Sequence, residues 1–215
     1  MPGNRTLRGI AALGVAVFPI ATFTSSCAFL GGGIEKADYS VLEKDGRFEI
    51  RLFEPCIVAE MVVESDFAEA GNIAFGRLYD YISGANRKQE SIAMTAPVSQ
   101  EARSQKIAMT APVNQQRAGD KWVVSFLMPA KYTMQTLPQP IDPAVTLREV
   151  PARKMAVARY SGTWSEKRYE KQRTGLQEFI QNQGLEIVGE AIFARYDPPF
   201  QLPFLRRNEV LIPVQ

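Results

Sequence analysis

The chain has 215 residues, of which 46% are hydrophobic and 22% are charged. These values suit one soluble domain with a sizeable core, or two small domains at most. Histidine is absent, which excludes Ser-His-Asp catalysis, histidine-bound zinc and any site that needs a histidine ligand to iron.

The first 26 residues have the order of a secretory signal. Arg5 and Arg8 precede an uncharged apolar run, residues 9–23, and small polar residues follow. A basic start, an apolar stretch and small residues are typical of export signals. A transmembrane helix needs about 20 apolar residues, whereas this run is shorter and contains Pro19. An uncleaved membrane anchor is the alternative.

Cys27 directly follows the small residues, and this arrangement resembles a bacterial lipobox. We therefore expect a signal peptide over residues 1–26 and lipidation of Cys27. The protein would then be an exported lipoprotein, anchored to a membrane and facing the periplasm or the exterior. Three consecutive glycines predict a flexible linker over residues 27–36. Without lipidation, Cys27 and Cys56 could form a disulfide.

The predicted mature chain carries no net charge. The signal contains two of the 25 basic residues and none of the 23 acidic ones, which leaves 23 of each sign. Nucleic-acid-binding domains normally have a strong basic excess, so we expect no nucleic-acid partner.

The first half of the domain predicts a hairpin, a strand and a helix. Apolar and polar residues alternate through residues 37–53 on both sides of Asp45-Gly46, a dipeptide typical of hairpin turns. A third strand is expected over Cys56–Val63. A helix then runs to about Ser83, with its N-cap at Ser65 or Asp66 and helical spacing of its apolar residues.

A seven-residue sequence follows twice. Residues 92–98 and residues 107–113 both read Ile-Ala-Met-Thr-Ala-Pro-Val. Both copies predict short strands, and because proline has no N–H to donate, Pro97 and Pro112 belong at sheet edges or bulges. Another strand is expected over residues 121–128.

The second half repeats this plan. Strands are expected at residues 145–150 and 153–160, a helix at 164–183, and further strands at 186–196 and 208–213. We therefore predict an α+β fold in a single domain, residues 37–215. Two similar strand–helix–strand–strand halves, about 37–130 and 140–215, would form an antiparallel sheet that curls toward a barrel, with both helices packed outside.

No motif points to an enzyme or a metal site. The sequence has no Gly-rich phosphate loop, no Gly-x-Ser-x-Gly and no cluster of metal ligands. We expect no catalytic residue; a hydrolase that uses Glu and Tyr is the alternative. Cys56 is a candidate thiolate ligand for iron, but its apolar strand favours a buried free thiol.

Four stretches together resemble the SOUL haem-binding family. They are the doubled Met-Thr-Ala-Pro-Val, residues 122–129 with Leu137-Pro138, residues 157–162, and residues 196–199 with 206–209. The resemblance covers about residues 37–214. It implies a barrel-like antiparallel fold with two helices, and it implies haem or a related tetrapyrrole as the ligand. Family members hold the porphyrin against the exposed side of the first helix, near the loop between the last two strands, and basic side chains meet the propionates.

Carried onto this sequence, the resemblance implies the ligand-binding residues Phe75, Arg77, Leu78, Tyr79, Ile82, Tyr196, Arg206 and Arg207. Where it implies basic residues on the helix and in the last loop, this chain has Asn72, Asp80 and Gln201. An amphipathic helix buries its apolar face by default, which favours a core role for the apolar stripe of this helix.

Four functions therefore remain. The first is non-catalytic binding of haem or a related tetrapyrrole at the cell envelope. The second is binding of another apolar or amphipathic small molecule, and the third is an enzyme that acts on such a ligand. The fourth is an envelope protein whose cleft has lost its ligand. The expected partners are a small apolar ligand and, through the lipid anchor, a membrane.

Overall fold

The computed structural model describes residues 34–88 and 104–215. The predicted signal peptide, Cys27 and the first copy of the repeat lie outside the described residues. Nine strands form the main sheet: β2 (Tyr39–Asp45), β3 (Phe48–Phe53), β4 (Cys56–Val63), β7 (Val113–Ala118), β8 (Lys121–Leu127), β10 (Thr146–Val150), β11 (Arg153–Tyr160), β12 (Ile192–Arg195) and β13 (Asn208–Pro213).

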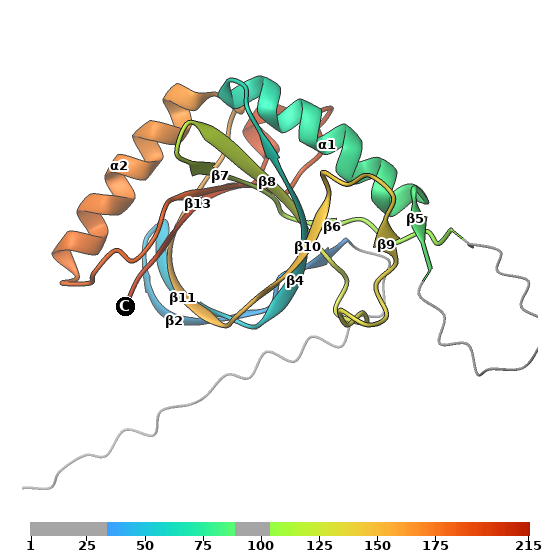
Figure 1. Ribbon diagram of the computed structural model, residues 1–215. Helices are drawn as coiled ribbons and strands as arrows, with labels where there is room; N and C mark the ends of the chain where they lie inside the picture. The colour runs from blue at the N-terminus through green and yellow to red at the C-terminus, as the bar shows by residue number, and fades with distance from the viewer. Residues whose placement is uncertain (1–33, 89–103) are drawn as a thin grey trace, which may run out of the picture. The chain divides into compact units, whose positions relative to one another are not determined.

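This sheet curls into an open ring, which Figure 1 shows nearly end-on. Its order is β10-β4-β8-β7-β12-β13-β11-β3-β2, and all neighbours are antiparallel. Within the described residues the edge strands β10 and β2 do not pair with each other. Two helices, α1 (Phe67–Ser83) and α2 (Glu166–Asn182), lie on the outside of the ring (Figure 1). The predicted α+β architecture is confirmed.

The described residues also form two short, two-stranded sheets. One joins β1 (Glu35–Lys36) to β6 (Thr110–Ala111), and the other joins β5 (Asn86–Arg87) to β9 (Gln139–Pro140). The predicted linker is thus ordered at its end, because Glu35 and Lys36 pair with β6. Pro112 has no N–H to donate to a sheet and separates β6 from β7. The second copy of the repeat is therefore divided between two sheets.

The helices begin and end where their capping residues stand. The Asp66 side chain accepts hydrogen bonds from the backbone N–H groups of Ala68 and Glu69, at 2.9 and 2.8 Å. Gly84, with φ of +132°, ends α1. The second helix begins at Glu166 rather than Trp164, because Ser165 is extended and caps it. No helix of the described residues is long and apolar enough to span a membrane.

Alternating side chains of the strands serve two different environments. On β8, Trp122, Val124 and Phe126 are buried on the outer face in the core beneath the helices, whereas Val123 and Ser125 line the interior of the ring. Inside the ring, β11, β12 and β13 bury a second apolar cluster, which consists of Met155, Val157, Ile192, Ala194 and Leu211. The main core therefore lies between helices and sheet, and the interior is partly free.

The predicted strand over residues 186–196 is shorter than expected. Only Ile192–Arg195 pairs as β12. Before it, Ile187 forms a single bridge with Val214, and the Val188 N–H donates to the Pro213 carbonyl at 3.0 Å. This segment follows the C-terminus instead of the sheet, and Ile187 and Val188 are exposed.

Candidate functional site

The outer face of α1 carries an aromatic pair. Phe75 and Tyr79 are one helical turn apart, and their rings stack with centroids 6.0 Å apart and 9° between the planes. The two residues are 40% and 50% exposed. Phe75 also meets the edge of Phe126 at 5.4 Å, which anchors the pair to the core. Parallel, solvent-facing rings offer a flat apolar surface to a planar ligand.

Arg77 lies between these two residues in the sequence and is bound to Asp142. Two hydrogen bonds of 2.5 Å join its guanidinium to the Asp142 carboxylate. These bonds hold the pKa of Asp142 below its ordinary value. Both side chains are near the surface, so an anionic ligand would reach Arg77 by replacing Asp142.

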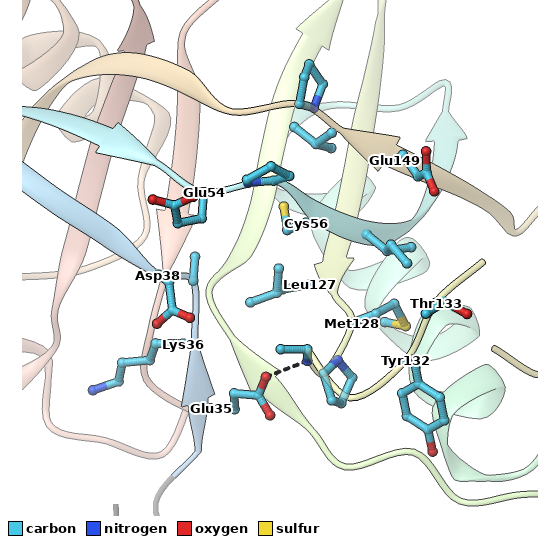
Figure 2. Close-up of a pocket in the computed structure, with 17 residues that line it drawn as sticks. Glu35, Lys36, Asp38, Glu54, Cys56, Leu127, Met128, Tyr132, Thr133 and Glu149 are labelled. Atoms are coloured by element: carbon cyan, nitrogen blue, oxygen red, sulfur yellow. Dashed lines mark hydrogen bonds between the residues drawn. The ribbon is translucent and has the colours of Figure 1, made fainter. Parts of the chain in front are cut away.

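A pocket of about 640 Å³ opens at one end of the ring (Figure 2). The turn between β3 and β4, the end of β8 and the turn between β10 and β11 enclose it. Carboxylates of Asp38, Glu54 and Glu149 stand around it. Cys56 and Leu127 line both this pocket and a narrower cavity of about 60 Å³ that continues into the ring.

Cys56 is a free, half-buried thiol on this pocket. Burial raises its pKa above the ordinary value of a cysteine thiol, and the charges of Arg153 and Arg148 oppose that shift only in part. The thiol is therefore protonated near pH 7, and a neutral thiol is a poor iron ligand. The prediction of a free thiol in an apolar strand agrees with this placement, except that Cys56 is not fully buried.

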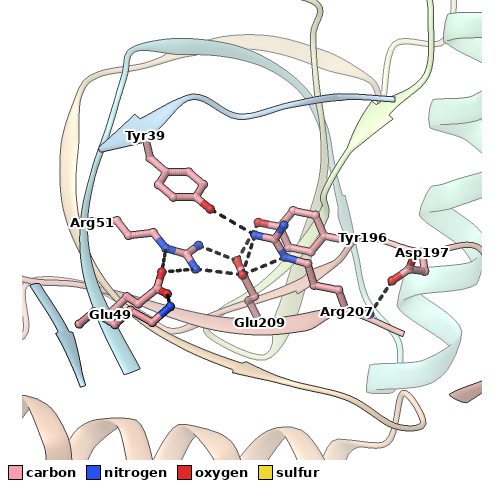
Figure 3. A network of polar contacts seen from close by, with 8 residues as sticks. Tyr39, Glu49, Arg51, Tyr196, Asp197, Arg207 and Glu209 are labelled. Carbon is pink, nitrogen blue, oxygen red and sulfur yellow. Dashed lines mark hydrogen bonds and ion pairs between the residues drawn. The ribbon is translucent and has the colours of Figure 1, made fainter. Parts of the chain in front are cut away.

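A charged network fills the interior at the other end (Figure 3). Glu209 is fully buried and accepts hydrogen bonds from Arg51 at 3.0 and 3.1 Å, from Arg207 at 3.0 and 2.8 Å and from the Tyr196 hydroxyl at 2.7 Å. Burial raises the pKa of Glu209, but hydrogen bonds and charges of the two arginines outweigh it, so the pKa is lowered. Every polar atom of this carboxylate is satisfied, which makes the network structural.

The comparisons with known proteins identify the family. A family model described as SOUL heme-binding protein matches residues 34–213. The chain belongs to the SOUL haem-binding family. Heme-binding protein 2 of Mus musculus is 27% identical over 178 residues, which cover 81% of this chain and 82% of the mouse protein.

Solved structures share the fold of this SOUL family member at low sequence identity. The EcmrR C-terminal domain is 12% identical with a TM-score of 0.56, over 82% of this chain and 98% of that domain. A hydrolase from Listeria innocua is 12% identical with a TM-score of 0.52, over 81% of this chain and 94% of that protein. At such identity the likeness shows the fold alone.

The structure divides the residues that the SOUL resemblance implies into three groups. Phe75, Tyr79 and Arg77 are all exposed on α1, but Arg77 lies two positions from each aromatic residue and points to the opposite flank of the helix, where it binds Asp142. Leu78 and Ile82 face the sheet instead and are 0% and 3% exposed, so they support the aromatic pair from below and belong to the core. The spacing of the apolar residues on α1 already favoured that role.

The remaining implied residues lie at the last loop or inside the ring. Tyr196 and Arg207 belong to the Glu209 network (Figure 3). The Arg206 guanidinium donates to the carbonyls of Gln201 and Pro199, at 2.8 and 2.5 Å, and lies 4.6 Å from the centroid of the Trp164 ring. These side chains fix the last loop and the interior.

The outer face of α1 fits a porphyrin ring that needs no strong axial ligand. Phe75 and Tyr79 would cover the ring. Histidine is absent from the sequence, and among residues 34–88 and 104–215 no group of three or more His, Cys, Asp or Glu could hold a metal ion. The barrel-end pocket of Figure 2 was missed by sequence reasoning, because its carboxylates come from separate segments that no motif connects.

Proposed function

We propose that this SOUL family protein binds haem or a related tetrapyrrole, without catalysis, at the cell envelope. The exposed stacked pair of Phe75 and Tyr79 carries the proposal, because it lies on the first helix, the face that the family resemblance implies. Burial of apolar surface would supply most of the affinity, at about 25 cal/mol per Å² covered. The propionates stay in solvent, since an unpaired buried carboxylate is costly.

Binding of the porphyrin is expected to depend on this aromatic pair and to be nearly independent of iron. Replacing Phe75 and Tyr79 together by serine should weaken the binding of both haem and metal-free protoporphyrin by roughly tenfold or more, because the apolar contact area is lost. Absorbance and fluorescence titrations of the purified protein measure both affinities.

Leu42→Ser with Val62→Ser is the matched control, because these two side chains are also exposed, at 56% and 57%, but lie on β2 and β4. The control should bind both porphyrins as the wild type does. A strong preference for haem over the free porphyrin would contradict the proposal, because it would reveal an axial ligand, and Cys56 would then be tested first.

A second candidate is another apolar small molecule in the barrel-end pocket. The volume of about 640 Å³ and the side chains of Cys56, Leu127 and Val150 favour it. Porphyrin or other ligand binding that survives the double serine variant would support this site. The hydrolase alternative concerns the same pocket, since Glu54, Glu149 and Tyr132 line it.

The location at the envelope has its own expected result. If Cys27 is lipidated, Cys27→Ala should move the protein from the membrane fraction to the soluble fraction of its host, because the acyl anchor is lost. Fractionation with mass spectrometry of the N-terminus measures this. Cys56→Ala is the matched control and should fractionate like the wild type. An unchanged N-terminus and distribution for Cys27→Ala would refute the lipoprotein.

A further inference from the structure

A second large pocket, of about 530 Å³, lies at the end of the ring opposite the pocket of Figure 2. The turn between β2 and β3, the C-terminal end of β11 and the last loop enclose it. The pocket of Figure 2 lies instead near the C-terminal end of β3 and the N-terminal end of β11. We call this second region the basic end, for its five cationic side chains, Lys44, Arg47, Arg159, Arg206 and Arg207.

The positive charge of the basic end is only partly compensated. Among the described residues that line the pocket, Glu49 is the one acidic residue, and it already binds Arg51 at 2.7 Å and Lys44 at 3.1 Å. The Arg207 charge is matched by Glu209. Within the described parts of the chain, Arg47, Arg159 and Arg206 have no carboxylate partner, since Arg47 reaches Gln172 and Arg206 reaches two carbonyls. Guanidinium groups without a carboxylate suit phosphate oxygens.

The last loop adds apolar side chains to the same end. Phe200, Leu202, Phe204 and Leu205 are 86%, 55%, 69% and 57% exposed. Phe204 and Leu205 also line the basic pocket. Four large exposed apolar residues within six positions form a patch that a soluble surface rarely carries without a partner.

The loop holds this patch in a fixed shape. The Gly162 N–H donates to the Pro203 carbonyl at 2.9 Å, and the Arg207 N–H donates to the Asp197 carboxylate at 2.5 Å. A short 3₁₀ turn, η1 (Pro203–Leu205), presents Phe204 and Leu205. The apolar side chains are therefore preorganised for a partner, which lowers the ordering cost of binding.

The geometry points to an anionic phospholipid bilayer as the partner of the basic end. Phe200 and Phe204 enter the interfacial layer, and the guanidiniums of Arg47 and Arg159, which have no carboxylate partner among the described residues, meet lipid phosphates. A soluble polyanion would satisfy the arginines but would leave the apolar patch uncovered. This surface is separate from the aromatic pair of α1, so the inference goes beyond the tetrapyrrole proposal.

The test follows the position of residue 204 in full-length protein reconstituted in vesicles. Phe204→Trp places a fluorophore on the patch, and wild-type emission from Trp122 and Trp164 is subtracted. In vesicles that contain brominated phosphatidylglycerol, the emission of the introduced indole should be quenched, and salt should weaken the quenching. In vesicles of brominated phosphatidylcholine alone, quenching should be slight. Ile141→Trp, at a site that is 54% exposed and lies beside the C-terminal end of α1, should stay unquenched.

The charges are tested in the Phe204→Trp protein. Arg47→Gln with Arg159→Gln should lower the ratio of docked to undocked protein about tenfold or more, since each basic side chain near an anionic surface contributes roughly a factor of five. Arg87→Gln with Lys131→Gln removes the same charge elsewhere and should change little. Equal quenching at positions 204 and 141, equal quenching in both lipids, or equal effects of the two charge variants would overturn the inference. Porphyrin affinity should be unchanged in all these variants, which separates this result from the proposed function.

Discussion

Glu209→Gln is expected to lower the free energy of unfolding by about 3–5 kcal/mol, because it removes one partner of a buried ion pair and leaves the other charges in place. Glutamine has the size of glutamate and can accept a hydrogen bond, but it cannot compensate Arg51, which is 2% exposed. Arg207 loses its carboxylate in the same step. Urea unfolding at pH 7 measures the change.

Glu64→Gln is the matched control for this variant. Its carboxylate pairs with Lys121 at 3.2 Å, but its side chain is 73% exposed. Exposed ion pairs contribute about 0–1 kcal/mol, so the control should unfold almost as the wild type does. Similar small losses for both variants would show that water reaches the interior network.

The pH dependence of stability provides a second measure of the same carboxylate. The pKa of Glu209 is lowered in the folded protein, so its contribution is present above the unfolded glutamate pKa and is lost as pH falls through the lower folded value. The wild type should lose stability below about pH 4.5, and Glu209→Gln should lose less over that range. Some slope remains in the variant, because the pKa of Glu49 is lowered as well.

Leu78→Ala is expected to cost about 2–5 kcal/mol of stability, because a fully buried leucine leaves a cavity when it is truncated. Leu78 is on the side of α1 that faces the sheet and is 0% exposed, whereas Phe75 on the same helix is 40% exposed. Phe75→Ala should therefore cost much less stability and should weaken porphyrin binding more. Thermal or urea unfolding and porphyrin titration of both variants measure the two effects.

The reverse pattern would contradict the assignment of the two faces of α1. If Leu78→Ala leaves stability unchanged, the helix does not pack on the sheet through this side chain. If Phe75→Ala costs as much stability as Leu78→Ala, the aromatic pair is part of the core and not a binding surface.

Local signals in the sequence predicted most of the fold. The turn at Asp45-Gly46, the cap at Asp66 and the glycine at position 84 each act over a few residues, so the hairpin and α1 followed from the chain itself. The segment before β12 was less predictable, because its apolar residues, Ile187 and Val188, suggested a strand. Its actual hydrogen bonds depend on where the C-terminus lies.

The candidate sites were predicted less completely, for a physical reason. Helical spacing shows which residues share an apolar stripe, but it does not show where the edge of the stripe leaves the sheet, so spacing alone could not separate the buried Leu78 from the exposed Phe75. The interior position of Tyr196 and Arg207 depends on the curl of the sheet, which brings them to Arg51, more than 140 residues away in the chain. No sequence window contains that contact.

Within the part of the chain that the structure describes, the open ring leaves β2 with one unpaired edge, and the composition of that strand affects how the protein behaves at high concentration. A bare edge is a template for a strand from another molecule, which leads to strand exchange and fibrils. Here the pairing with β3 shifts register between Val41 and Glu43, and three charged residues, Glu43, Lys44 and Asp45, end the strand. The irregular backbone and the alternating charges make this edge a poor template, so concentrated solutions of the folded protein should resist edge-to-edge assembly.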